Sequence, residues 1–315
     1  MFFNVKAKLA MLILGIVLVA GCASNDNNVV GTANGLEINN FTTTQAEIFS
    51  GSKTTVSLNI ENQGESLVNA GNGGILLIGA NEWNPTNVVR AFSKTLRPAN
   101  TFTNPPTPAG QQIESWTLTA PVLGKGQSRP YILTGRIYYD YLTSVVGSIK
   151  IYPESEVTAA QDTGEELDKS SWSVSRGPVS MVVTVSPDPV VVSTSGDNIF
   201  TLQVTLTNDE SGIAYRNGTV SGVTADGTDT TPFTIDSDEL NIVQLALSGL
   251  DGKINLNLTD PTCIDNIQLV SGSATIICDV NVTKPVNVPT PFSIAMNASY
   301  GYYTDEQLTI TAIGK

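Results

Sequence analysis

The sequence contains no histidine among its 315 residues. Serine–histidine and cysteine–histidine nucleophile pairs are therefore excluded, as are histidine-based zinc, copper and non-haem iron sites. Hydrolysis by two carboxylates needs only Asp and Glu, so that chemistry remains open. We expect no catalytic site, no metal and no cofactor, and we keep a carboxylate-dependent glycoside hydrolase as an alternative.

Charged residues are scarce, at 14% of the chain, and unbalanced, with 29 acidic against 16 basic residues. The net charge of −13 repels nucleic acid, so we expect no nucleic-acid partner. Low charge combined with abundant Ser, Thr, Asn, Gly and Val is typical of β-rich extracellular proteins.

No apolar run is long enough for a permanent membrane span. The run from Leu9 to Val19 follows two lysines and is shorter than the ~20 residues that a span needs. It predicts a secretory signal peptide over residues 1–21. The end of this segment, Val19-Ala-Gly-Cys22, resembles the lipobox of bacterial and archaeal lipoproteins. The resemblance implies that Cys22 is lipidated and becomes the mature N-terminus; ordinary cleavage near Gly21 is the alternative.

Cysteine is rare, with three copies. With Cys22 assigned to the lipid, Cys263 and Cys278 remain as one pair in an oxidising compartment, which predicts a disulfide. The segments 267–270 and 274–277 flank a Ser-Gly-Ser turn and predict a hairpin that this bond would close. Two reduced, buried thiols are the alternative.

Short β-runs separated by turn residues fill the chain from about residue 36. Thr54–Ile60 alternates with period two, as a half-buried strand does. The expected strands are 36–38, 46–49, 54–60, 75–78, 88–92, 116–120, 131–141 and 145–152, then 179–185, 190–192, 200–207, 218–223, 241–247, 253–258, 267–270, 274–282, 292–299 and 308–313.

An acidic stretch without this pattern of short strands and turns separates the two halves. Carboxylates accumulate after Pro153, and Arg176-Gly-Pro178 precedes the next strand. The pattern predicts a solvated linker at 153–177, with room for a helical turn at Thr158–Asp168. The expected organisation is a polar tether at 22–33, one domain at 34–152 and a second at 178–315. We expect the domains to fold independently and the linker to be cut first by proteases.

Two short sequence similarities, which we call echoes, connect the halves. The strand Leu58-Asn-Ile-Glu-Asn62 parallels Leu206-Thr-Asn208, and Tyr139-Asp-Tyr141-Leu-Thr143 parallels Tyr300-Gly-Tyr302-Tyr-Thr304. The chain here resembles the tandem immunoglobulin-like, cell-adhesion-related modules of prokaryotic surface proteins. The resemblance implies an all-β fold of two tandem immunoglobulin-like Greek-key β-sandwiches. It carries over no functional residue.

Three groups of residues are candidates for binding, each with a structural alternative. The carboxylates of Asp226-Gly-Thr-Asp229 and Asp236-Ser-Asp238-Glu239 suit calcium or solvated turns. A cationic-aromatic patch suits polysaccharide or protection of a strand edge; it comprises Arg90, Lys94 and Arg97 near Trp83 and Phe92. Six tyrosines suit a glycan platform or a structural corner, with Tyr139 and Tyr141 on one face; they are Tyr138, Tyr139, Tyr141, Tyr300, Tyr302 and Tyr303.

Asn-x-Ser/Thr sequons permit glycosylation without arguing for it, because a chain this rich in Asn, Ser and Thr contains several by chance. They lie at Asn40, Asn217, Asn257, Asn281 and Asn297.

These features predict a non-catalytic, membrane-anchored protein of the cell envelope, on the extracellular face or in the periplasm. Its expected role is that of a structural, adhesion or spacer module. Its partners would be the membrane, through the lipid, and a surface protein or polysaccharide. One alternative is a binding subunit of an envelope or secretion assembly that pairs through an exposed strand edge. The other is the glycoside hydrolase.

Overall fold

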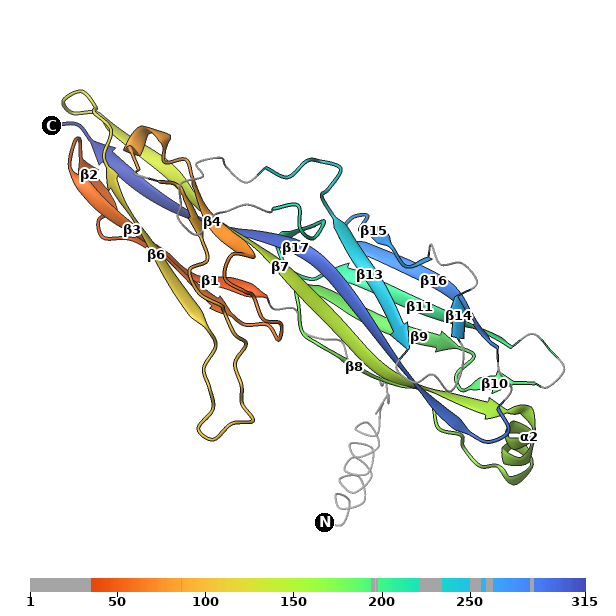
Figure 1. Cartoon of the computed structure of the whole chain (residues 1–315). Coiled ribbons are helices and arrows are strands. Elements are labelled where there is room, and N and C mark those ends of the chain that lie inside the picture. The colour runs from red at the N-terminus through yellow and green to blue at the C-terminus, as the bar shows by residue number, and fades with distance from the viewer. Residues whose placement is uncertain are drawn as a thin grey trace, which may run out of the picture.

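The computed structural model describes residues 35–85, 87–193, 196, 198–220, 234–249, 256–258, 263–283 and 286–315. This part of the chain is all-β apart from one α-helix and one short 3₁₀ helix. The fold is elongated, and two lobes follow one another along a pair of very long strands (Figure 1). The C-terminus lies at the end of one lobe and the helix α2 at the end of the other. In the described part, no helix has both the length and the apolar character needed to cross a membrane.

The elements up to and including the first long strand are β1 (Leu36–Thr43), β2 (Glu47–Phe49), β3 (Lys53–Asn62), β4 (Gly73–Ile78), η2 (Asn81–Trp83), β5 (Val89–Ala91), β6 (Gln111–Thr119) and β7 (Ser128–Pro153). They are followed by α2 (Glu154–Thr163), β8 (Ser171–Val174), β9 (Val179–Ser186), β10 (Val190–Val192), β11 (Ile199–Asn208), β12 (Ile213–Tyr215), β13 (Ile242–Gly249), β14 (Leu256–Leu258), β15 (Asn266–Gln268), β16 (Ser273–Val282) and β17 (Thr290–Ile313).

The long strands β7 and β17 form a ribbon that passes through both lobes. They pair antiparallel, and all 24 residues of β17 take part, from Thr290 opposite Ile151 to Ile313 opposite Ser128. At about 3.3 Å per residue the ribbon is ~80 Å long. Its midpoint lies at the neighbouring pairs Tyr139–Tyr302 and Asp140–Gly301. The last residues of the chain therefore belong to the N-terminal lobe, where they also pair with β2.

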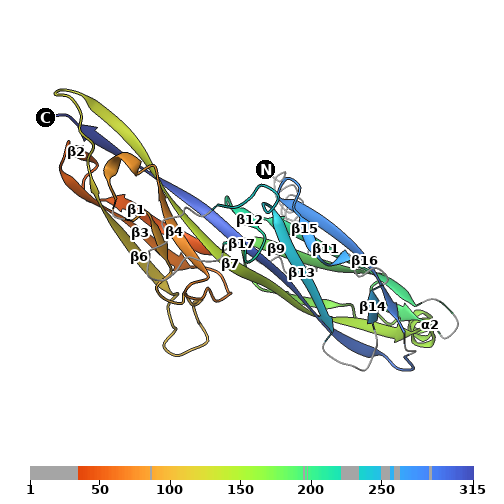
Figure 2. The same cartoon turned by 45° about the horizontal axis from the view of Figure 1, so that its top comes forward.

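The ribbon is the centre of a ten-stranded sheet with the order β15-β13-β17-β7-β4-β5, to which β2, β8, β10 and β12 add pairs along the ribbon. Two smaller sheets cover its ends. The sheet β1-β3-β6 belongs to the N-terminal lobe and the sheet β14-β16-β11-β9 to the C-terminal lobe, and Figure 2 shows them as separate layers beside the ribbon.

One face of the ribbon is buried along most of its length, except near Glu306, which is exposed. Odd-numbered residues of β7 and even-numbered residues of β17 point inward without any shift in the alternation, among them Leu133, Ile137, Val145, Ile149, Phe292, Ile294, Met296 and Ile310. Because side chains alternate between the two faces of a strand, both small sheets pack against the same face of the ribbon.

Two of the expected strand breaks are wrong. The segments 131–141 and 145–152 are parts of one strand, as are 292–299 and 308–313. The stretch between 299 and 308, which was not expected to be a strand, continues β17, and its residues Asp305, Glu306 and Gln307 are exposed. They lie where the lobes meet, so the backbone continues its pairing there while the side chains remain in solvent.

The expected linker at 153–177 contains two regular elements. α2 starts directly after Pro153, has Glu154 and Glu156 in its first turn where the helix dipole favours acidic groups, and ends at Gly164 with φ 71°. β8 then pairs with the C-terminal half of β7. The division into domains at 34–152 and 178–315 remains a prediction.

The disulfide between Cys263 and Cys278 is confirmed, with a Cα–Cα distance of 5.7 Å. The hairpin expected between them forms only at its turn, where Val270 and Ser273 exchange backbone hydrogen bonds of 2.9 and 3.2 Å. Beyond the turn the strands separate, because β15 pairs with β13 in the ten-stranded sheet whereas β16 pairs with β11 in the covering sheet. A two-residue turn at Ser271 and Gly272, both with positive φ, carries the chain from one layer to the other. The disulfide therefore ties the segment that precedes β15 to β16 of the covering sheet.

Candidate functional site at the waist

The two lobes meet at the midpoint of the ribbon, a region that we call the waist. Four tyrosines occupy its inner face, with Tyr139 opposite Tyr302 and Tyr141 opposite Tyr300. Their ring centroids lie 5.9 and 6.0 Å apart across the strands, and each residue is at most 3% exposed. The tyrosine echo in the sequence is thus one aromatic cluster in the structure.

The hydroxyls of the two β7 tyrosines hold the N-terminal lobe. The Leu36 N–H donates to the Tyr139 hydroxyl at 3.1 Å. The Tyr141 hydroxyl accepts from the Glu65 N–H at 3.0 Å and donates to the Arg176 carbonyl at 2.9 Å. The latter bond ties the first lobe to the segment that enters the second.

The hydroxyls of the two β17 tyrosines do the same for the C-terminal lobe. The Val179 N–H donates to the Tyr300 hydroxyl at 3.0 Å, and this hydroxyl also bonds the Thr143 hydroxyl at 2.9 Å. The Tyr302 hydroxyl donates to Asn208 Oδ1 at 2.9 Å. Each lobe is therefore attached to the ribbon by two buried hydroxyls.

Burial raises the pKa of all four phenols above the ordinary value of 10.0. A buried phenolate lacks solvation, so the neutral hydroxyl persists across the usual pH range. These rings offer no surface to a glycan, and the platform interpretation is wrong for them. The shared face of Tyr139 and Tyr141 is confirmed.

The asparagine echo also has a common structural role. Asn62 ends β3 and Asn208 ends β11, which are the middle strands of the two covering sheets. The Asn62 side-chain amide donates to the Ser66 carbonyl at 2.8 Å, and the Asn208 amide donates to the Gly212 carbonyl at 2.8 Å. Both close a turn of five residues, so the two lobes share one local design at the ends of these strands.

A second cluster lies on the outer face of the ribbon. The Arg136 guanidinium binds Asp305 directly across the strands through two bonds of 2.5 and 2.7 Å. It lies 4.4 Å from the centre of the Tyr303 ring. Tyr138 and Tyr215 pack beside it, with ring centroids 6.4 Å apart. This cluster links β7, β12 and β17.

A small acidic hollow opens beside the inner tyrosines. Its volume is about 170 Å³, and its carboxylates come from Glu37, Glu210, Asp305 and Glu306. Burial first, and then the charges of Glu37 and Asp209, raise the pKa of Glu210. The hollow is smaller than the roughly 300–1,000 Å³ of usual small-molecule sites. In the described residues, no group of acidic or cysteine side chains converges in a way that could hold a metal.

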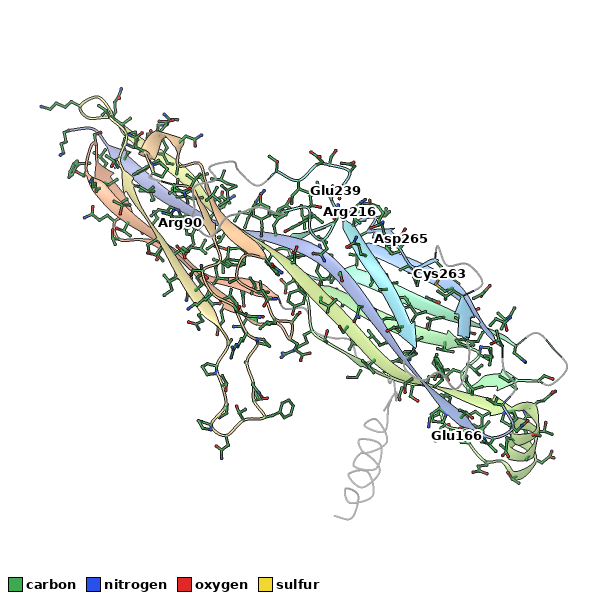
Figure 3. The ribbon with its side chains drawn as sticks, viewed as in Figure 1. Arg90, Glu166, Arg216, Glu239, Cys263 and Asp265 are labelled. Carbon is green, nitrogen blue, oxygen red and sulfur yellow. A yellow bond between two sulfur atoms is a disulfide. The ribbon has the colours of Figure 1, made fainter. Side chains whose placement is uncertain are left out.

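The expected cationic-aromatic patch is wrong in its aromatic half. Trp83 and Phe92 are buried in the core, with exposures of 0 and 1%, and Trp83 packs edge-on against Tyr131. Arg90, which Figure 3 labels on the N-terminal lobe, therefore has neither ring on the surface beside it.

The acidic loops are only partly described. Asp226 and Asp229 lie outside the described residues. Glu239 forms an ion pair with Arg216 at 2.8 Å, and the two labelled side chains lie together in Figure 3. An existing partner thus already holds the best-placed carboxylate of the second loop.

The remaining predicted positions are dispersed. Asn40 is exposed, whereas Asn217, Asn281 and Asn297 are half-buried. Asn297 accepts a bond of 2.8 Å from the Ser144 hydroxyl within the large sheet. Cys22 and the side chain of Asn257 lie outside the described residues, so lipidation and glycosylation remain predictions.

Sequence reasoning missed the Arg136–Asp305 pair and the acidic hollow. Their members lie far apart in the chain, and only the register of the ribbon brings them together. The continuous period-two alternation of β7 could have indicated one long strand, but no signal in the sequence shows that β17 lies beside it.

No family model matches this chain, and no curated protein matches its sequence.

Proposed function

We propose that this protein is a non-catalytic, lipid-anchored module of the cell envelope. Its two lobes would form two rigid arms that extend in opposite directions from one attachment point. Each arm would be an immunoglobulin-like sandwich, as the resemblance implies, and the arms would serve structural or adhesive contacts. The main observation that supports this proposal is the position of Gly35, the first residue of the described fold.

That place is the waist. The backbone at Gly35 packs so closely that a side chain there would collide with the Tyr139 hydroxyl and with Pro178. The next residue, Leu36, is bound to the same hydroxyl. The entry point is thus fixed beside the midpoint of the ribbon, about 12 residue pairs or ~40 Å from either end.

This position of the entry point changes the expected spacer role from a stalk that stands on the membrane to a bridge that lies along it. Thirteen residues run from Cys22 to Asn34; as the flexible tether that the sequence predicts, they would span about 20 Å on average. Since each arm is about twice as long, a lipid on Cys22 would hold the waist near the membrane and leave both ends free. The protein would then act as a bridge along the surface rather than as a stalk.

Anchoring is tested by substituting Cys22→Ser. The proposal expects loss of the protein from the membrane fraction and of the acyl mass from the mature chain. A variant that stays in the membrane fraction, together with a wild-type chain of unmodified mass, would contradict it.

The attachment geometry is tested by energy transfer to acceptor-labelled lipid headgroups. A single dye is placed at Lys125→Cys, in the turn before β7, or at Asp162→Cys, on α2 at the opposite end. Attachment at the waist predicts similar transfer from both. A stalk predicts efficient transfer from one position and almost none from the other, about 80 Å away.

A second candidate function, binding within an envelope assembly through a strand edge, is favoured by the long open edge of β6.

A further inference from the structure

β6 forms an open edge of the covering sheet in the N-terminal lobe. It pairs with β3 on one side, without a shift of register from Lys53–Thr119 to Glu61–Gln111. At its flanks, the Asn62 N–H donates to the Gly110 carbonyl at 3.1 Å and the Ala120 N–H donates to the Ser52 carbonyl at 2.9 Å.

These two flanking bonds show which backbone groups are open. Hydrogen-bonding direction alternates along an antiparallel strand. The even-numbered residues between Gly110 and Ala120 therefore point toward β3, and the odd-numbered ones present N–H and C=O to the open side. Those residues are Gln111, Ile113, Ser115, Thr117 and Thr119. Within the described part of the chain, no backbone group bonds to them from that side.

This edge lacks the usual protection against strand addition. It contains no Lys, Pro, Gly or bulge, its one charged residue is Glu114, and Ile113 is 65% exposed. Natural edges are normally blunted by such features or by short length. Among the other described edges, β1 carries a register shift between Ile38 and Asn40, β5 and β15 have three residues each, and β14 covers the end of β16. β9 is a second long edge that pairs with β11 alone, and it belongs to the more acidic C-terminal lobe.

We infer that β6 is a self-association site, at which it pairs antiparallel with β6 of a second copy. The inference deepens the second candidate function by naming the partner. A two-fold axis through Ser115 pairs each open residue with another open residue, Ile113 with Thr117 of the second copy and Gln111 with Thr119. Glu114 then faces Trp116, so the two carboxylates do not meet.

The distribution of charge favours this lobe for contact between identical chains. Residues 35–140 and 301–315, which include β6, hold 8 basic and 9 acidic residues, whereas residues 141–300 hold 6 basic and 19 acidic residues. Two copies repel each other through the second set far more than through the first. A weak pair would suffice on a membrane, because tethering raises the effective concentration to the millimolar range.

The test uses the full chain with Cys22→Ser, so that it does not depend on anchoring, and sedimentation equilibrium up to about 1 mM. The expected result is a reversible dimer. Ser115→Pro removes one outward N–H while keeping the bonds to β3, and it should weaken association about tenfold or more. Ser115→Ala, the matched control, should leave it unchanged.

A second pair of variants guards against misfolding. Ile113→Lys with Thr117→Lys places like charges opposite each other across the two-fold axis and should abolish the dimer at low salt. Thr55→Lys adds charge on the same face one strand further in, opposite Thr117, and should dimerise normally. A monomer at every concentration, or a dimer indifferent to both edge changes, would overturn the inference. Failure of Cys22→Ser to release the protein would instead count against anchoring alone.

Discussion

The two lobes share a strand plan and differ in their surfaces. Each has a covering sheet whose middle strand ends in the same asparagine turn, at Asn62 and at Asn208, and each is held by two buried tyrosine hydroxyls. The segments that build them nevertheless carry net charges of about −1 and −13. The comparison indicates that the tyrosine hydroxyls and asparagine amides near the waist determine the shared architecture. The surface charges of the two lobes can differ without changing these contacts.

The lobes also stabilise their cores differently. The two fully buried tryptophans, Trp83 and Trp116, belong to the N-terminal lobe. The disulfide between Cys263 and Cys278 ties the segment before β15 to β16 in the C-terminal lobe. One lobe therefore contains the large buried indole rings, and the other contains a covalent cross-link.

The largest effect is expected from removing the disulfide. Cys263→Ala with Cys278→Ala should cost about 3 kcal/mol, from the 15-residue loop that the bond closes, or roughly 6–12 °C in melting temperature. Because the ribbon joins the lobes, we expect the entire circular-dichroism transition to shift. Cys22→Ser is the control and should melt as wild type. A shift of only part of the amplitude would indicate lobes that melt separately.

A smaller effect is expected from the corresponding waist tyrosines. Tyr300→Phe leaves the buried Val179 N–H without its acceptor and should cost about 1–3 kcal/mol. Tyr139→Phe removes the acceptor of the Leu36 N–H and a long bond of 3.5 Å to the Leu36 carbonyl. It should cost less, because the Tyr300 hydroxyl also holds a 2.9 Å bond with the Thr143 hydroxyl.

Urea unfolding midpoints measure both changes. Tyr303→Phe is the control, because in the described residues its hydroxyl has no hydrogen-bond partner. A larger cost at Tyr139 than at Tyr300 would show that the two attachments were ranked wrongly.

The smallest effect concerns Asp140, whose partner across the ribbon midpoint is Gly301. Burial raises the pKa of this carboxyl, although the Gly218 N–H opposes the shift. The folded state therefore binds the proton more tightly than the unfolded state. As a result, stability falls as pH rises from about the ordinary value of 3.8 through the raised pKa.

Asp140→Asn should consequently raise the melting temperature at pH 7 by about 1–2 °C and change it less at pH 3. Thermal melts at the two pH values measure this. A loss of stability at pH 7 would mean that the bond from Gly218 outweighs the cost of burying the charge.

Local structure was readable from the sequence. The alternating run in β3, the strands of β11 and β16, and the pairing of Cys263 with Cys278 followed from period-two patterns and cysteine count. The shared face of Tyr139 and Tyr141 followed from the same alternation.

Contacts between strands that are far apart in the sequence could not be predicted. Alternation indicates a strand but not its neighbour, so β15 and β16 looked like a hairpin although they lie in different layers. Asp305 fell outside the expected strands because nothing in the sequence shows that Arg136 lies opposite it. The aromatic residues Trp83 and Phe92 looked accessible because burial at the ends of short strands depends on the covering sheet.

Differential scanning calorimetry of the full chain tests the shared ribbon most directly. If β7 and β17 couple the lobes, the chain should unfold in a single transition whose calorimetric and van't Hoff enthalpies agree. Leu133→Ala in the N-terminal lobe and Met296→Ala in the C-terminal lobe should each move that one transition. Two resolved transitions, each moved by only one of these substitutions, would show independent domains and contradict the account.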